Sequence, residues 1–193
     1  MKPVHALALS TLLALPLASQ AQSRSQYGAM SYSYGDARLV VVEPDGGGSY
    51  DGIRLDGSFQ FQPQLFGIAA ITTYGDRGVD ITMLEGGVGY RQALRSGMDL
   101  VAQGGLVLAE IDAGPFEDDD TGLFLSGGLR GVATPQIEYG AYAEYRSIFD
   151  DGDITLTGEG LLHFTRNLAL VASLGLSDDA NTLTFGARWS FAR

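Results

Sequence analysis

The chain of 193 residues contains no cysteine, and this absence excludes several classes of protein. Without thiols there is no disulfide scaffold, no Cys-ligated zinc or iron–sulfur centre and no thiol nucleophile. Basic residues are also scarce, because 12 Lys and Arg stand against 23 Asp and Glu. A net charge of -11 argues against a nucleic-acid partner, since phosphates require a clustered Lys/Arg surface. The 27 glycines follow no three-residue repeat, which excludes collagen.

Residues 1–21 have the parts of a secretory signal peptide. Lys2 supplies the positive start, residues 6–17 are mostly apolar, and the segment ends with small residues suited to cleavage. The apolar stretch is too short for a retained transmembrane helix and is interrupted by a proline. We therefore expect export and cleavage after Ala21, which leaves one domain over residues 22–193 without any lysine.

The rest of the sequence lacks helical periodicity and a second long apolar run, and it alternates between apolar and polar residues. In one clear run, Ile53, Leu55, Gly57, Phe59 and Phe61 share a face, and Arg54, Asp56, Ser58, Gln60 and Gln62 share the other. This alternation predicts strands at 30–43, 51–62, 65–74, 80–93, 98–111, 121–133, 136–148, 153–165, 168–177 and 182–192. In the first of these, Tyr32 and Tyr34 share the parity of Asp36 and Arg38 unless Gly35 marks a bulge.

The connections between these runs alternate in kind. Four are short, at residues 62–64, 94–97, 134–135 and 166–167, and five are longer and acidic, at 44–50, 75–79, 112–120, 149–152 and 178–181. An up-and-down meander produces this pattern, and an even strand number allows it to close. The predicted fold is therefore all-β, an antiparallel up-and-down β-barrel of ten strands. Eight strands remain possible if 65–74 and 168–177 are not strands.

A soluble lipocalin-type barrel shows the same alternation, but its apolar face points inward, whereas a transmembrane barrel presents its apolar face to lipid. The membrane version is favoured because the polar face carries full charges, at Arg54, Asp56, Glu85, Arg91, Asp99, Arg130, Glu138, Glu144, Arg146, Glu159 and Arg188. Aromatic residues also fall near strand ends, as two interfacial belts require. They are Phe59, Phe61, Tyr90, Phe164, Trp189 and Phe191 near the short turns, and Tyr50, Tyr74, Tyr145 and Phe149 near the acidic connections. The ending Trp189-Ser190-Phe191 is close to the aromatic C-terminal signal of bacterial outer-membrane barrels, with two further residues after it.

Several segments together resemble the Xanthomonas-type Ax-twenty-one family of small outer-membrane proteins. They are SYSYGDA (31–37), DGIRLDGSFQFQPQLFG (51–67), GGVGYRQAL (86–94), DLVAQGGLVLAEIDA (99–113), GGLRGVA (127–133), EYGAYAEYRSIFDD (138–151) and FGARWSF (185–191). More loosely, the chain is similar to the narrow OmpA and OmpX barrels. The resemblance implies an outer-membrane or vesicle-borne protein linked to biofilm, motility and host interaction, and it supplies no active site.

The residues offer little for catalysis, so we predict no enzyme. The small outer-membrane proteases and deacylases use a His at the outer rim, whereas His163 adjoins a short turn and faces the lumen with Glu159 and Thr157. A hydrogen-bonded structural histidine is the favoured interpretation. We predict no catalytic, cofactor-binding or metal-binding residue and no cofactor, and the acidic connections match no EF-hand spacing.

Two functions remain from different classes. The lumen charges are nearly balanced, which favours an interior salt-bridge ladder over a pore lined by one sign of charge. Gly86, Gly87, Gly89, Gly127 and Gly128 either permit close strand curvature, the favoured interpretation, or leave water-filled gaps. The leading prediction is a non-enzymatic surface protein, either structural or interacting through acidic extracellular loops, and the alternative is a narrow passive channel or porin-like transporter.

The expected location is the bacterial outer membrane. The acids gather in the five acidic connections, whereas Arg95, Arg166 and Arg193 lie on the opposite, periplasmic side. Expected partners are outer-membrane lipid and lipopolysaccharide, and the barrel-assembly machinery during insertion, with no nucleic acid. The sequence identifies no extracellular partner.

Overall fold

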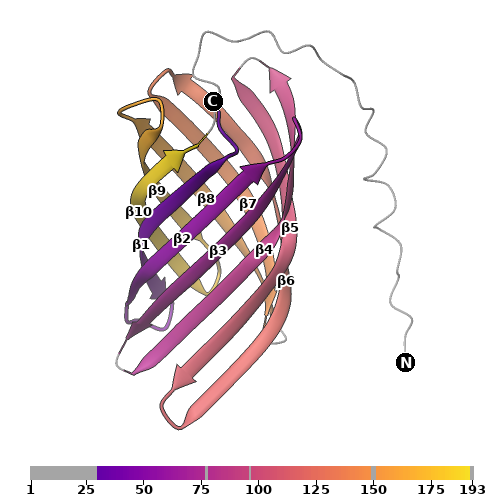
Figure 1. Cartoon of the computed structure of the whole chain (residues 1–193). Helices are drawn as coiled ribbons and strands as arrows, with labels where there is room; N and C mark the ends of the chain where they lie inside the picture. Colours follow the sequence, from indigo (N-terminus) through magenta and orange to yellow (C-terminus); the bar gives the residue numbers. More distant parts are fainter. Residues whose placement is uncertain (1–29, 77, 96, 149–150, 192–193) are drawn as a thin grey trace, which may run out of the picture.

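The computed structural model describes residues 30–76, 78–95, 97–148 and 151–191, so the predicted signal peptide lies outside the described residues. Ten antiparallel strands form one closed barrel, in which each strand pairs with its sequence neighbours and β1 pairs with β10 (Figure 1). The predicted fold class is confirmed, including all ten strands. The strands are β1 (Tyr34–Pro44), β2 (Tyr50–Gln60), β3 (Leu65–Asp76), β4 (Val79–Arg95), β5 (Met98–Ala113), β6 (Phe116–Thr134), β7 (Ile137–Ile148), β8 (Asp151–His163), β9 (Leu168–Leu176) and β10 (Ala180–Ser190).

The two ends of the barrel differ in chemistry. The start of β1 and the end of β10 lie at the end that also carries the β2–β3, β4–β5, β6–β7 and β8–β9 turns, which we call the terminal end (Figure 1). The other five connections form the opposite end, which we call the acidic end. Among the described residues, no helix is long and apolar enough to cross a membrane.

The acidic connections are shorter than the sequence predicts. Residues 112–120 were expected to form a loop, but β5 continues to Ala113 and β6 begins at Phe116, so only a tight turn remains. Gly114 has a φ of 73°, a conformation that glycine adopts at little cost. The acidic residues therefore lie on a β-hairpin formed by β5 and β6, of 16 and 19 residues. This hairpin extends beyond its neighbours (Figure 1).

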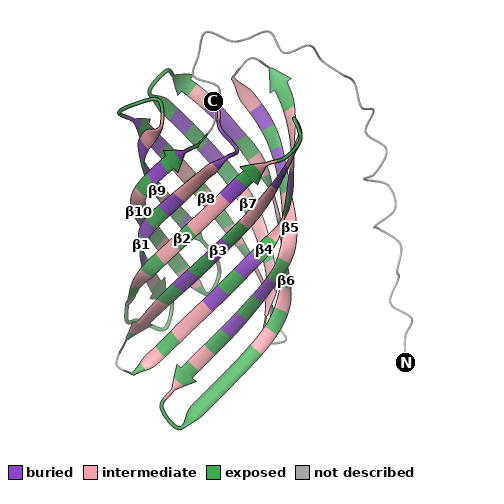
Figure 2. Cartoon of the chain, in the orientation of Figure 1, coloured by how far each residue is buried: buried purple, intermediate pink, exposed green. Residues whose placement is uncertain are grey.

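The outward face of the barrel is apolar. Buried and exposed residues alternate along the strands, as the two-residue period of a strand requires (Figure 2). Large apolar side chains such as Leu39, Leu106 and Phe185 are about half exposed on the outside, whereas Arg130 and Arg188 are buried inside. This is the reverse of a soluble barrel, and it places the outer face in lipid.

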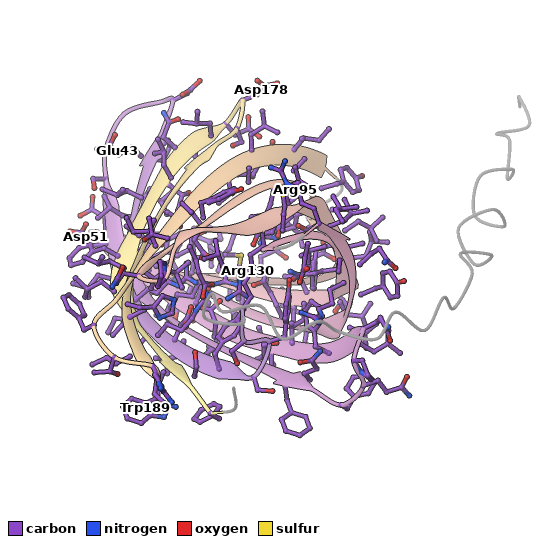
Figure 3. The ribbon with its side chains drawn as sticks, turned by 90° about the horizontal axis from the view of Figure 1, so that it is seen from above. Glu43, Asp51, Arg95, Arg130, Asp178 and Trp189 are labelled. Carbon is purple, nitrogen blue, oxygen red and sulfur yellow. The ribbon has the colours of Figure 1, made fainter. Side chains whose placement is uncertain are left out.

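The aromatic belt near the terminal end is confirmed, with Phe59, Phe61, Phe164, Trp189 and Phe191 all exposed. Figure 3 shows Trp189 pointing away from the barrel. The belt predicted near the acidic end is largely wrong. Tyr74 lines the lumen, and the Tyr50 ring lies edge-on to it with 6.3 Å between ring centroids, whereas Tyr145 is exposed and Phe149 lies outside the described residues.

The apolar face generates a direct prediction about membrane position. Leu39 lies in the middle of β1, between the outward residues Ile53 and Phe185 of the paired strands. Leu39→Arg should lower the free energy of unfolding in lipid vesicles by about 2–4 kcal/mol, because it places a charge near the bilayer midplane. Leu94→Arg, beside a terminal-end turn, is the matched control and should cost about 0–1 kcal/mol. Equal losses at both positions would contradict the assignment of the outer face to lipid.

Candidate functional site: the lumen

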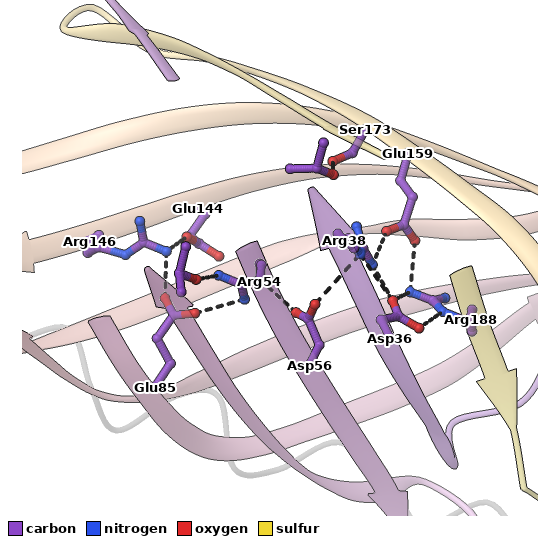
Figure 4. Close-up of polar contacts among 12 residues, drawn as sticks. Asp36, Arg38, Arg54, Asp56, Glu85, Glu144, Arg146, Glu159, Ser173 and Arg188 are labelled. Atoms are coloured by element: carbon purple, nitrogen blue, oxygen red, sulfur yellow. Dashed lines mark hydrogen bonds and ion pairs between the residues drawn. The ribbon is translucent and has the colours of Figure 1, made fainter. Parts of the chain in front are cut away.

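An ion-pair network, which we call the lumen network, crosses the interior of the barrel (Figure 4). Its centre is Arg188 on β10, whose guanidinium donates to both carboxylate oxygens of Asp36 on β1, at 2.8 and 2.7 Å. Arg38 also donates to Asp36, and it reaches Glu159 on β8 at 2.9 Å. The Arg188 side chain is 3% exposed and Asp36 is fully buried, so each charge depends on its partner for stability.

The lumen network continues from β2 to the opposite wall. Arg54 lies 2.7 Å from Asp56 and 2.8 Å from Glu85 of β4. Arg146 of β7 then joins Glu85 at 2.6 Å and Glu144 at 2.7 Å. Arg38 connects the two halves, with 3.6 Å between its Nε and an Asp56 oxygen. The predicted interior salt-bridge ladder is confirmed, and it spans the lumen rather than following one wall.

Residues 30–33 fold into the lumen at the terminal end and form what we call the plug. Tyr32 is 2% exposed, packs against Phe66 with 4.9 Å between ring centroids, and donates a hydrogen bond of 3.0 Å to Asp99. The guanidinium groups of Arg91 and Arg130 lie over the Tyr32 ring at 5.0 and 4.8 Å. A tyrosine held by stacking, two cations and a carboxylate is strongly fixed.

The backbone of the plug is bonded to the barrel wall as well. The Ser31 carbonyl accepts a hydrogen bond from Arg130, and the Tyr32 carbonyl accepts one from Ser58. The Ser33 hydroxyl accepts from the Gln60 amide. The sequence predicted a strand from residue 30, and this boundary is wrong, because these residues bond to the lumen wall and β1 begins at Tyr34.

His163 faces the lumen at the terminal end, as predicted. Its Nε2 lies 2.9 Å from an oxygen of Glu138 on β7, whose other oxygen accepts a hydrogen bond of 2.8 Å from Arg130. Glu159 belongs to the lumen network. His163 is thus hydrogen-bonded, as expected, and its structural role stays a prediction.

Every charged residue predicted to face the lumen does so, and the structure joins them in three groups. The first group is the lumen network, with Arg54, Asp56, Glu85, Glu144, Arg146, Glu159 and Arg188. The second group contacts the plug and consists of Arg91, Asp99 and Arg130. In the third, Glu138 links Arg130 to His163. The alternation alone left open which side of β1 Asp36 and Arg38 face, because Tyr32 and Tyr34 share their parity. The register of β1 with β2 and β10 is continuous through Gly35, so there is no bulge there and these residues all face inward.

Three of the five glycines, Gly87, Gly89 and Gly128, allow close approach between strands or side chains, whereas Gly86 and Gly127 have open space where a Cβ atom would be. Gly89 lies against the Phe66 ring, where a Cβ atom would overlap the aromatic carbons. Gly87 faces Gly105 across the β4–β5 pair, again with no room for a Cβ atom. Glycine is thus required where Phe66 fills the lumen beside Tyr32, which supports the curvature interpretation over water-filled gaps.

A cavity of about 380 Å³ occupies the lumen on the acidic side of the lumen network. Its lining includes Ser177 and Ala180 beside the last connection at the acidic end, and Arg38, Glu159 and Arg188 of the lumen network. A smaller space of about 70 Å³ adjoins Arg54 and Glu85 from the lumen network and extends to Ile68, which packs against the Tyr32 cluster. The interior is therefore hollow toward the acidic end and filled toward the terminal end.

The charge asymmetry between the two ends is present in the fold. Glu43, Asp51 and Asp178 are exposed at the acidic end, and Arg95 and Arg166 are exposed at terminal-end turns. Arg193 lies outside the described residues. Among the described residues, no group of three or more His, Asp or Glu side chains is arranged to hold a metal ion.

No family model and no curated protein matches the chain. Several solved structures do. The NanC porin matches with a TM-score of 0.50 at 10% identity, covering 80% of this chain and 100% of that one. The KdgM porin gives 0.47 at 14% identity over 81% and 99%, and Ail, the attachment invasion locus protein of Yersinia pestis, gives 0.42 at 16% over 82% and 95%. At these identities the likeness is one of fold, that of a small outer-membrane barrel, and membership of the Ax-twenty-one family stays a prediction.

The lumen network predicts a large cost for losing its central cation. Arg188→Leu leaves the buried carboxylates of Asp36 and Glu159 with Arg38 as their one remaining arginine partner, so the free energy of unfolding in detergent or lipid should fall by about 3–5 kcal/mol. Arg95→Leu removes an exposed arginine and should change it by about 0.5 kcal/mol or less. Urea titration followed by heat-modifiable gel mobility measures both. A small loss for Arg188→Leu would show that the lumen charges are solvated.

Proposed function

We propose that this protein is a non-enzymatic barrel of the bacterial outer membrane whose lumen is closed and which acts at the cell surface through its acidic end. The observation that supports this most directly is the plug, because Tyr32 and Phe66 fill the lumen at the terminal end with fixed side chains. The lumen network adds a second obstruction. Small barrels with filled interiors serve as scaffolds, whereas wide channels need 16–18 strands.

The proposed orientation has the acidic end outside the cell. In this orientation the extended β5–β6 hairpin, with Glu117, Asp118, Asp119 and Asp120 and the exposed Phe116 at its turn, projects from the membrane. The proposed partners follow from this position: outer-membrane lipid and lipopolysaccharide around the barrel, and the assembly machinery that inserts it through an exported, signal-bearing precursor. Roles in biofilm formation, vesicle association and host contact belong to this proposal, and the family resemblance supports them.

A narrow passive channel is the second candidate, and the two spaces in the lumen favour it. The 380 Å³ cavity and the 70 Å³ space share Arg54, Asp56 and Glu144 as lining, so they lie on one path toward the plug. Displacement of the plug would then leave the lumen network as the remaining barrier.

Conductance separates the two candidates. The refolded chain starting at Gln22 should be silent in planar bilayers, because the plug and the lumen network obstruct the lumen. Tyr32→Ala removes the ring contact with Phe66 and the bond to Asp99 that hold the plug, so it should produce conductance steps that stay small because the lumen network still narrows the path. Tyr139→Ala, on the outer face, is the matched control and should stay silent. Regular conductance steps from the unmodified chain would favour the channel instead.

A cell assay tests the surface role. Replacing Glu117 with Gln and Asp118, Asp119 and Asp120 with Asn removes the four charges on the β6 arm of the projecting hairpin. Biofilm mass and attachment should fall relative to cells carrying the unmodified protein, at equal amounts of heat-modifiable barrel. The change of Asp178 and Asp179 to Asn, on a hairpin that projects less, should have a smaller effect. Unchanged attachment in both variants would count against a role of the acidic end.

A further inference from the structure

The lining of the 380 Å³ cavity has two chemically different parts. The wall formed by β8, β9 and β10 carries side-chain hydroxyls at Thr155, Thr157, Ser173, Ser177, Thr182 and Thr184. Strands β1, β3 and β4 contribute an apolar patch of Val40, Val42, Tyr74 and Met83, beside Arg38 and Thr72 from the same strands. A volume of this size is within the range of small-molecule sites, and such sites combine apolar surface with a few oriented polar groups.

Part of the hydroxyl wall has no protein partner. Thr184 and Ser173 bond to each other at 2.7 Å, and Thr155 lies 3.5 Å from an Asp153 oxygen. By contrast, within the part of the chain that the structure describes, the side-chain hydroxyls of Thr157 and Thr182 make no hydrogen bond to another protein group. Each can donate to and accept from a bound molecule. Two free hydroxyls at intermediate depth on one wall are suited to a ligand that itself carries hydroxyl groups.

The charges around the cavity select against an anionic ligand. The guanidinium groups in the lining belong to Arg38, Arg54, Arg146 and Arg188, and each already pairs with a carboxylate of the lumen network. An added anion would therefore be buried without a free cation beside it, which is costly. The exposed acids at the acidic end, including Asp51 and Asp178, also repel an anion on its way in (Figure 3).

We propose that this cavity binds an uncharged sugar, of one or two rings, that enters from the acidic end. A sugar ring has C–H faces that suit the apolar patch with Tyr74 and Met83, and peripheral hydroxyls that suit Thr157 and Thr182. Because the cavity lies on the acidic side of the lumen network, binding requires neither passage through the barrel nor displacement of the plug. Sugar binding in this cavity is separate from the proposed surface role, and it does not depend on whether the barrel conducts.

Calorimetric titration of the refolded protein tests the proposal, in lauryldimethylamine oxide micelles because glycoside detergents would compete. Two probes share one ring and differ in charge, glucose and glucuronate, with maltose as a neutral two-ring probe. Glucose or maltose should bind saturably, and glucuronate at least tenfold more weakly than glucose. The absence of saturable binding for both neutral sugars, or equal or tighter binding of glucuronate, would overturn the proposal.

Matched variants locate the site. T157V/T182V removes two hydroxyls at nearly constant shape and should weaken neutral-sugar binding about tenfold, as the loss of two neutral hydrogen bonds predicts. T121V removes an exposed hydroxyl on the β6 hairpin and should leave binding unchanged. Heat-modifiable gel mobility verifies folding. If the double variant T157V/T182V does not fold, the single variants T157V and T182V are tested instead. Binding to T157V/T182V that equals that of the unmodified protein would place the sugar elsewhere and overturn the proposal. Channel recordings test the proposed function separately, so the two can fail independently.

Discussion

The requirement that a buried charge have a partner determines the interior of this barrel. Lipid surrounds the outside, so the polar face of every strand must point inward, and the arginines and carboxylates found there would be costly if left alone. These side chains meet the requirement by pairing with one another. Arg188 pairs with both Asp36 and Glu159, and Arg38 connects that group to Asp56. The same pairing that stabilises the fold also obstructs the lumen. Stability and closure are therefore two effects of one arrangement.

The polar groups of the plug are paired as well. The Tyr32 hydroxyl donates a hydrogen bond to Asp99, and the guanidinium groups of Arg91 and Arg130 lie over its ring, so Tyr32 adds no unpaired polar group to the interior. Gly89 makes the room that the Phe66 ring needs beside it. As a result, the terminal half of the lumen is packed, whereas the acidic half keeps a cavity with free hydroxyls. The barrel is thereby open toward one side only.

The strict two-residue period of a strand explains why so much could be predicted from sequence. It gave the number of strands, the lipid-facing side and the inward position of residues such as Arg130 and Glu138. The aromatic belt expected near the acidic end failed at Tyr50 and Tyr74, which face inward, because it was inferred from their positions near strand ends. Ion-pair partners could not be predicted either. The pairing of His163 with Glu138 rather than Glu159 depends on the stagger of the strands around the closed barrel, which alternation within one strand does not encode.

The pair between Asp36 and Arg188 has a consequence for how the protein assembles. These residues are 152 positions apart and lie on the first and last strands, so they meet only when the barrel closes. Until then Asp36 lacks its two hydrogen bonds from Arg188, and a partly formed sheet has unpaired edges in lipid as well. Intermediates short of closure are therefore penalised twice, which makes insertion a nearly all-or-none event. Loss of either terminal strand by proteolysis would then remove the whole barrel rather than leave a nine-stranded remnant.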